Sequence, residues 1–397
     1  MIENLMDTYK RYPISFSKGE GSWLYDSDGR KYLDFAAGIA VNVLGHGHPK
    51  IKKVMHEAID NVWHVSNLYH IPEQQKLAKK LCDISFADKV FFCNSGAEAV
   101  EGAIKTSRKY HFEKGDKDRT DIITFKNAFH GRTLATLAAG ANPKHTEGFG
   151  PLPSGFENIE LSQQQLEEKI SNKTAAVLIE PIQGEGGIRL TPKEDLQMIR
   201  DLTSKHGVLM ILDQVQCGLG RTGDFFSHEW AGVEPDIITL AKGLGAGFPI
   251  GAILASTDAS SGMVHGSHGS TFGGNPLACS VALKVLEIID EEKILSNVKS
   301  LSEFLLAGIN DIIENHKDKI TSVRGRGFML GIKCEVENTL IAETALNNGL
   351  LLVPAADNII RLLPPLNTEK NDIEAVSYTH LRAHETRHDL VCRLLLE

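Results

Sequence analysis

The sequence has no long run of apolar residues. No stretch approaches the roughly 20 uninterrupted apolar residues that span a bilayer. The first four residues, Met1 to Asn4, lack the basic and then apolar pattern of a secretory signal. We therefore expect a cytoplasmic protein with no membrane partner.

Excess positive charge and paired cysteines are also missing. The formal net charge is −9, and a nucleic-acid partner would need a basic face, so no such partner is expected. The six cysteines include no Cys-x-x-Cys pair, and most lie in apolar windows. This pattern indicates reduced, packed thiols rather than a disulfide framework or a metal site, and it leaves small molecules as the expected ligands.

What the chain does have is a regular alternation of apolar strands and helices. With 397 residues it exceeds the usual size of one compact core, so two domains are expected. Strands separated by helices predict an α/β fold with a mostly parallel sheet covered on both faces. The expected strands are residues 90–93, 122–125, 175–179, 208–212, 237–240 and 250–254.

Helix signals lie between and around these strands. Ser95 with Glu98 predicts a capped helix over 96–114, and Thr191 as N-cap with Gly207 as stop predicts a second. Further helices are expected over 51–62, after Asn275 and over 294–314, and a β-hairpin over 23–35. The remainder reads as a smaller α+β domain.

Three ionisable residues follow neighbouring strands: Glu180, Asp213 and Lys242. Ligands of parallel sheets bind outside the carboxyl ends of the strands, so we expect these groups to converge. A partly desolvated lysine at such an edge, before a glycine-rich segment, can lose its proton and attack a carbonyl, as in a Schiff base with an aldehyde cofactor; a solvated lysine at a strand end is the alternative. A buried aspartate needs a cationic partner, which a protonated heteroaromatic nitrogen would provide.

Other motifs are weaker. Ser95 to Ala97 at a helix start could hold an anion, and Phe129 with Arg132 could stack on a planar ring and bind a carboxylate. Each also suits a purely structural role. The pair His46-x-His48 lacks a third ligand, which disfavours a metal site, and no P-loop run follows a strand.

Taken together, the motifs resemble those of the class III, pyridoxal-phosphate-dependent aminotransferases. The resemblance runs from about residue 10 to about residue 376, in unbroken motif order. It is carried by Asn94–Ala99, Phe129–Thr133, Glu180–Gly187, Asp213–Gly220, Lys242–Gly245 and Ser270–Pro276.

The resemblance implies the cofactor pyridoxal 5′-phosphate and fold type I of its enzymes. In this fold a large domain with a mostly parallel sheet accompanies a smaller α+β domain built from both chain ends. The implied boundaries are 1–55 and 285–377 for the small domain and 56–284 for the large one. Residues 378–397 are rich in His and Arg and resemble a vector-derived tail.

The resemblance also implies roles for individual residues. Lys242 looks like the Schiff-base lysine and Asp213 like the partner of the pyridine nitrogen; both are implied to be catalytic. The other implied cofactor-binding residues are Ser95, Gly96, Ala97, Phe129, His130, Gln214, Val215, Gln216 and Thr271, with Thr271 reaching the other subunit of a homodimer with shared sites. The implied substrate-binding residues are Arg132, Ser270, Glu185 and Arg361, with Glu185 pairing with Arg361 as a switch.

The expected reaction moves a distal amino group from an amino donor to 2-oxoglutarate. N2-acetylornithine is the expected donor, and ornithine, succinylornithine and 4-aminobutyrate remain alternatives, as does cofactor binding without turnover. One departure from the family pattern concerns Gln214, where a glutamate is usual. A second is the foreign-looking tail in place of a final helix.

Overall fold

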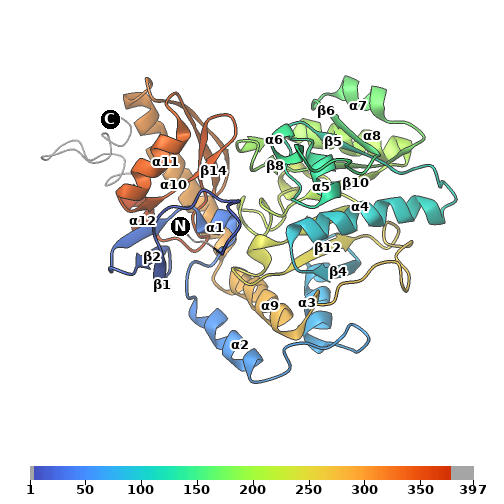
Figure 1. The fold of residues 1–397 in the computed structure, drawn as a ribbon, viewed down its shortest axis with the longest axis horizontal. Helices are drawn as coiled ribbons and strands as arrows, with labels where there is room; N and C mark the ends of the chain where they lie inside the picture. Colours follow the sequence, from blue (N-terminus) through green and yellow to red (C-terminus); the bar gives the residue numbers. More distant parts are fainter. Residues whose placement is uncertain (1–3, 377–397) are drawn as a thin grey trace, which may run out of the picture.

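The computed structural model describes residues 4–376, so the predicted tail at 378–397 lies outside the described residues. Figure 1 shows two lobes, with the larger one built on a seven-stranded sheet. The strand order is β4 (Lys89–Cys93), β12 (Gly251–Ala255), β11 (Ile237–Leu240), β10 (Leu209–Asp213), β7 (Thr174–Ile179), β5 (Asp121–Phe125) and β6 (Phe156–Ile159). The six predicted strands are therefore confirmed, with ends shifted by a residue or so.

The large sheet is mostly parallel, as predicted, because only β12 runs antiparallel to its two neighbours. Both faces are buried. Along β10, Met210 and Leu212 belong to one core cluster, while Leu209 and Ile211 belong to another. This alternation follows from the two-residue repeat of a strand, and it requires helices on both sides of the sheet.

Helices supply both layers. The second cluster contains α4, and the first contains residues of α3, α7, α8 and α9. The helices are α1 (Ala37–Ala40), α2 (Pro49–Ile59), α3 (Pro72–Asp83), α4 (Gly96–Glu113), α5 (Leu134–Gly140), α6 (Pro143–Thr146), α7 (Gln163–Lys169), α8 (Lys193–His206), α9 (Pro276–Glu291), α10 (Ile294–Asn315), α11 (Asn338–Asn347) and α12 (Lys370–Glu374).

The predicted caps are confirmed in part. Ser95 accepts a hydrogen bond from the Glu98 N–H at the start of α4, and Gly207 ends α8 in the left-handed conformation with φ of +61°. The prediction of Thr191 as N-cap is wrong. Helix α8 begins at Lys193, and the Thr191 hydroxyl instead donates to the carbonyl of Glu180. This hydrogen bond attaches Thr191 to Glu180, the residue that follows β7.

The small lobe combines both ends of the described chain (Figure 1). One sheet has the order β1 (Phe16–Glu20), β2 (Trp23–Asp26), β3 (Lys31–Asp34) and β15 (Leu350–Leu351), and another has β13 (Ile320–Arg326), β14 (Met329–Cys334), β17 (Ile359–Leu362) and β16 (Val353–Ala355). The predicted hairpin over 23–35 is β2 with β3. Trp23 Nε1 donates to Asp372 Oδ1 at 2.8 Å, which joins the two chain ends directly.

A short hairpin leaves the large lobe toward the small one. It consists of β8 (Ile182–Gln183) and β9 (Arg189–Leu190), and its loop contains Glu185. It follows Glu180 and Pro181 immediately, so the end of strand β7 and this hairpin are one continuous piece of the site.

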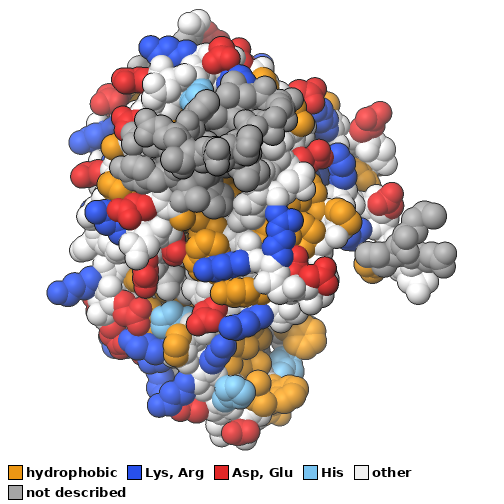
Figure 2. Space-filling model, turned by 90° about the vertical axis from the view of Figure 1, so that its left-hand side faces the viewer, with side chains coloured by type: hydrophobic (Ala, Val, Ile, Leu, Met, Phe, Trp, Pro, Cys, Tyr) orange, Lys and Arg blue, Asp and Glu red, His pale blue; other side chains and the backbone are white. Residues whose placement is uncertain are grey.

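The surface carries charges of both signs. Figure 2 shows the end of the molecule that the small lobe forms, where acidic, basic and hydrophobic side chains are interspersed. Within residues 4–376, no helix has the length and apolarity to cross a bilayer.

The two histidines of the His-x-His pair contact carboxylates: His46 lies 2.7 Å from Asp34, and His48 lies 3.4 Å from Glu292.

Candidate active site

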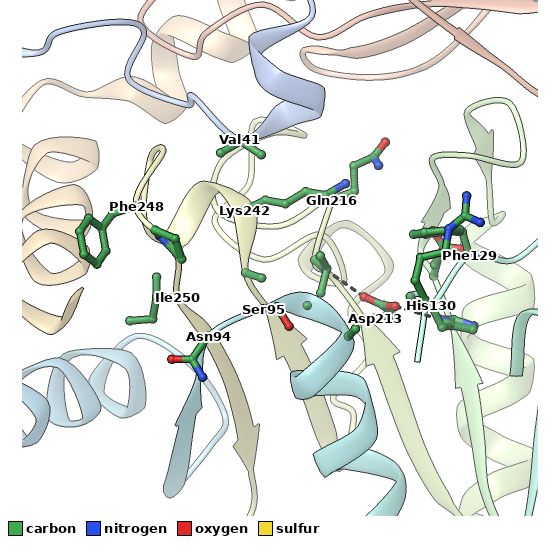
Figure 3. Close-up of a pocket in the computed structure, with 18 of the residues that line it drawn as sticks. Val41, Asn94, Ser95, Phe129, His130, Asp213, Gln216, Lys242, Phe248 and Ile250 are labelled. Atoms are coloured by element: carbon green, nitrogen blue, oxygen red, sulfur yellow. Dashed lines mark hydrogen bonds and ion pairs between the residues drawn. The ribbon is translucent and has the colours of Figure 1, made fainter. Parts of the chain in front are cut away.

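A pocket of about 430 Å³ opens at the carboxyl ends of β7, β10 and β11. Its lining includes Glu180, Asp213 and Lys242, so the predicted convergence of these three groups is confirmed. Figure 3 shows Lys242 reaching across the pocket, with Asp213 and His130 on one side and Phe248 and Ile250 on the other.

Lys242 directly follows β11 and its adjoining residue Ala241. Its backbone is left-handed, with φ of +42°, and such strain in a residue other than glycine marks a constrained position. The conformation turns the side chain into the pocket (Figure 3). Burial lowers the pKa of Lys242 to about 8, partly offset by the negative charge of Glu185. A substantial fraction of the amine is therefore neutral and nucleophilic near physiological pH.

Asp213 ends β10 and is held by three hydrogen bonds. His130 Nδ1 lies 2.8 Å from Oδ2, the Thr239 hydroxyl donates to Oδ1 at 3.1 Å, and the Val215 N–H donates to Oδ1 at 3.1 Å. The carboxylate is only 4% exposed, so its orientation is fixed. On the far side of its ring, the buried His130 Nε2 has no hydrogen-bond partner among the described residues.

Glu180 is the second buried carboxyl of the pocket. Burial and the adjacent Asp213 raise the pKa of Glu180 well above its usual range. Its Oε2 accepts the N–H of Phe129 at 2.8 Å, and its Oε1 accepts that of Gly184 at 3.3 Å. Glu180 thus ties the Phe129 loop and the β8–β9 hairpin to the end of β7.

The start of α4 forms another wall of the pocket. Ser95, Gly96 and Ala97 all line it. A Cβ atom at Gly96 would lie 2.7 Å from Val215 Cγ1, so glycine is needed for this close approach. The N-terminal amides of an 18-residue helix therefore face the pocket, and such amides attract anions.

Two arginines are available for carboxylates. Arg132 lines the pocket, with its guanidinium carbon 5.5 Å from the centre of the Phe129 ring and Nη2 3.2 Å from His145 Nε2. Arg361 is buried on β17 and pairs with Glu185. Gln216 links this pair to the pocket, because it lines the pocket and its Oε1 accepts from Arg361 Nη1 at 3.3 Å.

Five predicted site residues are not among those that line this pocket: the Glu185–Arg361 pair, and Gln214, Ser270 and Thr271. Gln214 is buried with its amide turned away: Nε2 lies 2.7 Å from His228 Nδ1, and Oε1 accepts from the Ser227 N–H at 2.7 Å. Neither Ser270 nor Thr271 is among the pocket-lining residues. Ser270 accepts from the Gly273 N–H, while Thr271 is exposed.

The pocket also contains residues that sequence reasoning did not select. Val41 directly follows α1, Asn94 precedes the predicted Ser95, and Phe248 and Ile250 lie at the end of the glycine-rich segment after Lys242. Asn94 belongs to the Asn94–Ala99 motif, and the glycine-rich segment directly follows Lys242, so the sequence could have predicted that both lie at the site. Val41 comes from a distant part of the chain, and no local pattern placed it at the site.

Comparisons with known proteins agree with this geometry. The family model described as Aminotransferase class-III matches residues 6–380. The acetylornithine aminotransferase of Mesorhizobium japonicum is 51% identical over 93% of each chain, and that of Methanocaldococcus jannaschii is 46% identical over 94% of this chain and 93% of its own.

Solved structures give the same result. The N-acetylornithine aminotransferase of Stenotrophomonas maltophilia is 36% identical with a TM-score of 0.82, covering 94% of this chain and 96% of its own. The ornithine aminotransferase of Toxoplasma gondii is 30% identical with a TM-score of 0.91, covering 94% and 91%.

Proposed function

From the premise that this chain belongs to the class III aminotransferase family, we propose that it is an acetylornithine aminotransferase of arginine biosynthesis. It transfers the 5-amino group of N2-acetylornithine to 2-oxoglutarate, which gives N-acetylglutamate 5-semialdehyde and glutamate. The observation that carries the reaction type is the partly buried Lys242, which lines one pocket with Asp213 at neighbouring strand ends. The choice of donor is supported by relatives of that name at 46–52% identity over more than nine tenths of the chain.

The cofactor of this enzyme is pyridoxal 5′-phosphate. The residues present fit it: the α4 N-terminus with Gly96 suits the phosphate, and Asp213 suits a protonated ring nitrogen. Phe129 offers a ring face, and Gln216 and Val215 line the same pocket. When bound, this group supplies an electron-withdrawing ring that stabilises negative charge on the carbon bearing the transferred nitrogen.

Lys242 has two tasks in the proposed mechanism. Its amine holds the cofactor between turnovers, which requires a neutral nitrogen, and burial provides this by lowering the pKa to about 8. During turnover the free Lys242 Nζ would act as the general base that takes the proton from the amine-bearing carbon of the donor and as the general acid that returns it. Asp213 keeps its orientation, because His130 contacts its Oδ2 and Thr239 donates to its Oδ1.

Substrate carboxylates are assigned to the two arginines. Arg132 binds the α-carboxylate of N2-acetylornithine from inside the pocket. Arg361 binds the α-carboxylate of 2-oxoglutarate or glutamate once Glu185 has moved aside. With the amine donor bound, Glu185 covers Arg361, as it does in this structure. One pocket can thereby accept two different substrates in turn.

We also propose a homodimer with shared sites. Thr271 is exposed and lies outside its own chain's pocket, so its hydroxyl is free to reach the phosphate of a partner subunit. Large apolar side chains nearby are exposed as well, including Phe272, which contacts His64, and Trp63 and Leu68. Sedimentation of the holoenzyme should show a dimer, and Thr271→Ala should weaken cofactor binding. A monomer with full activity would contradict this arrangement.

A cytoplasmic location is part of the proposal. Cys93, Cys217, Cys279 and Cys334 are buried as free thiols, which suits a reducing compartment. Cell fractionation followed by immunoblotting tests this, and recovery from outside the cytoplasm would contradict it.

The function is tested by an absorbance scan of the purified protein before and after N2-acetylornithine is added. We expect a spectral change of the bound cofactor that 2-oxoglutarate reverses, and a higher kcat/KM for the acetylated donor than for ornithine, succinylornithine or 4-aminobutyrate. A spectrum unchanged by all four amines would indicate cofactor binding without turnover. Lys242→Ala should abolish both half-reactions, so a retained half-reaction would refute the role of Lys242.

A further inference from the structure

The loop that carries Glu185 is attached to the small lobe through its backbone. The Ala356 N–H donates to the Glu185 carbonyl at 3.1 Å, and Arg324 Nε donates to the Gly187 carbonyl at 2.6 Å. Ala356 lies in the turn between β16 and β17, and β17 carries Arg361. Both members of the Glu185–Arg361 pair are therefore held by the same group of strands.

Asp357, in that turn, forms ion pairs with three basic side chains from different strands. Its Oδ2 accepts from Arg324 Nη2 at 2.8 Å and lies 3.2 Å from Arg189 Nη2, while its Oδ1 accepts from Lys333 Nζ at 3.1 Å. Burial alone would raise the pKa of Asp357, but hydrogen bonds from Arg324 and Lys333 lower it. Arg189 belongs to the Glu185 hairpin and the other two to the small lobe, so Asp357 bridges the two lobes.

Ile188 fixes the hairpin from its other side. It is fully buried and has a left-handed backbone with φ of +55°, which is strained for a β-branched residue and persists only where packing enforces it. A Cβ atom at Gly331 would lie 2.9 Å from Ile188 Cβ, and one at Gly325 would lie 2.9 Å from Ile188 Cγ2. Gly331 is the register partner of Arg361, so Ile188 fills a space beside the strand that carries this arginine.

We propose that Asp357 is a positioning residue that joins the Glu185 hairpin and strand β17 into one unit, so that the Glu185–Arg361 pair opens by rotation of the Glu185 side chain and not by displacement of the hairpin. This inference rests on the proposed function, because it explains how one arginine serves two substrates. The carbonyls of Glu185 and Gly187 are engaged by the small lobe, which leaves the Glu185 carboxylate as the movable part.

The unit matters most when the amine donor is bound. If the hairpin drifts, Glu185 no longer covers the buried Arg361, and an uncompensated positive charge faces a cationic amine. Binding of 2-oxoglutarate does not need that cover, because its own carboxylate neutralises Arg361. Loosening the unit should therefore impair one half-reaction more than the other.

The test compares Asp357→Asn with Asp224→Asn in the holoenzyme. Asp224 is a matched control because it also binds two cations, Lys299 and Arg326, but does not touch the hairpin. For Asp357→Asn we expect kcat/KM of the N2-acetylornithine half-reaction to fall about three- to tenfold, with less than about a twofold change for 2-oxoglutarate. Hydrogen exchange of the peptide 183–190 should accelerate in Asp357→Asn only.

Equal changes in both half-reactions, or unchanged exchange of 183–190, would overturn the proposal. If Asp357→Asn does not fold, Arg189→Gln replaces it, since Arg189 is the partly exposed hairpin side of the same ion pair. It should give the same selective loss at smaller size, and no selective loss would again overturn the proposal. A wild-type enzyme that lacks the amine half-reaction would refute the proposed function instead, while the exchange comparison would still test the unit.

Discussion

Arg361 and Glu185 form a bidentate ion pair: Nη1 lies 2.5 Å from Oε1, and Nη2 lies 3.2 Å from Oε2. The arginine side chain is 1% exposed and the glutamate side chain 32% exposed. The Arg361 guanidinium is thus enclosed by protein, whereas the Glu185 carboxylate is partly open to solvent. Such an asymmetric pair is suited to opening by movement of the glutamate. Movement of Arg361 would instead shift a buried charge away from its partner, which is energetically costly.

Replacing Glu185 by glutamine should separate the two half-reactions. Without a carboxylate over Arg361, the amine donor meets a buried positive charge, and kcat/KM for N2-acetylornithine should fall by roughly 30-fold, equivalent to about 2 kcal/mol. The KM for 2-oxoglutarate should stay the same or decrease, because a competitor for Arg361 is gone. Stopped-flow absorbance of each half-reaction measures both values; a rise in the KM for 2-oxoglutarate would contradict the switch.

The titration of Lys242 should be visible in cofactor-free protein. Burial lowers the pKa of Lys242 to about 8, so its acylation by an amine-selective reagent should be half-maximal near pH 8. Lys114 is an internal comparison, because hydrogen bonds to Asp258 and Tyr110 raise its pKa. Mass spectrometry of the two peptides across pH 6–11 measures this, and reaction of Lys242 only after Lys114 would refute it.

The same shift affects stability with a defined sign. The folded protein binds the Lys242 proton less tightly than the unfolded chain, whose lysine has a pKa of 10.5. Between about pH 8 and 10.5 the unfolded state therefore binds more protons, and this group makes the free energy of unfolding of the cofactor-free protein rise with pH. Urea unfolding of wild type and Lys242→Met should show that this increment disappears in the variant.

Restoring the family's glutamate at position 214 should destabilise this protein. Burial lowers the pKa of His228 to about 4, and its Nδ1 faces the Gln214 amide as an acceptor. An introduced carboxylate would present a second acceptor to Nδ1, so the folded state would need an extra proton. Urea unfolding of Gln214→Glu should show a loss of about 1–3 kcal/mol at pH 8 that shrinks toward pH 6.

In wild type the sign is opposite. The pKa of His228 is about 4 in the folded state and 6.5 in the unfolded state. The contribution of neutral His228 to the free energy of unfolding is therefore complete above pH 6.5 and is lost as the pH falls from 6.5 to about 4. The double variant Gln214→Glu/His228→Gln replaces the acceptor by an amide donor and should remove the new pH dependence. If the single variant is as stable as wild type at pH 8, this account of the pair is wrong.

His130 should contribute to cofactor affinity through Asp213. His130→Phe keeps the ring volume but removes the donor at 2.8 Å from Oδ2, leaving the carboxylate with Thr239 and the Val215 amide. A hydrogen bond to a charged group contributes about 1.5–3 kcal/mol, so the Kd for pyridoxal 5′-phosphate should rise roughly 10- to 100-fold. Equilibrium dialysis measures the Kd.

His111 provides the control for that variant. It is also a buried histidine, and its Nε2 contacts the Ala175 carbonyl at 2.9 Å, but it does not line the pocket. His111→Phe should lower the free energy of unfolding and leave the Kd unchanged. If both variants weaken cofactor binding equally, the effect of His130 is on folding and not on Asp213.

The strands and most helix ends were predictable because their signals are local. The apolar run before Asp213 and the glycine at 207 act within a few residues of themselves, and both predictions are confirmed. Thr191 shows where local patterns fail to predict structure. It matched an N-cap pattern, but its hydroxyl donates to the Glu180 carbonyl on the other side of the hairpin. The domain boundaries at 55, 284 and 377, and the roles given to individual site residues, stay predictions.

The amino-acid sequence by itself determined the alternating architecture, the placing of Glu180, Asp213 and Lys242 at strand ends, and the likeness of its motifs to one enzyme family, because each depends on short-range periodicity and spacing. Only the tertiary structure decided that Gln214 turns away to His228, that Val41 joins the pocket, and that Asp357 and Ile188 hold the Glu185 hairpin. These contacts join residues far apart in the chain, and their energies arise only when burial brings the partners together and removes water from between them.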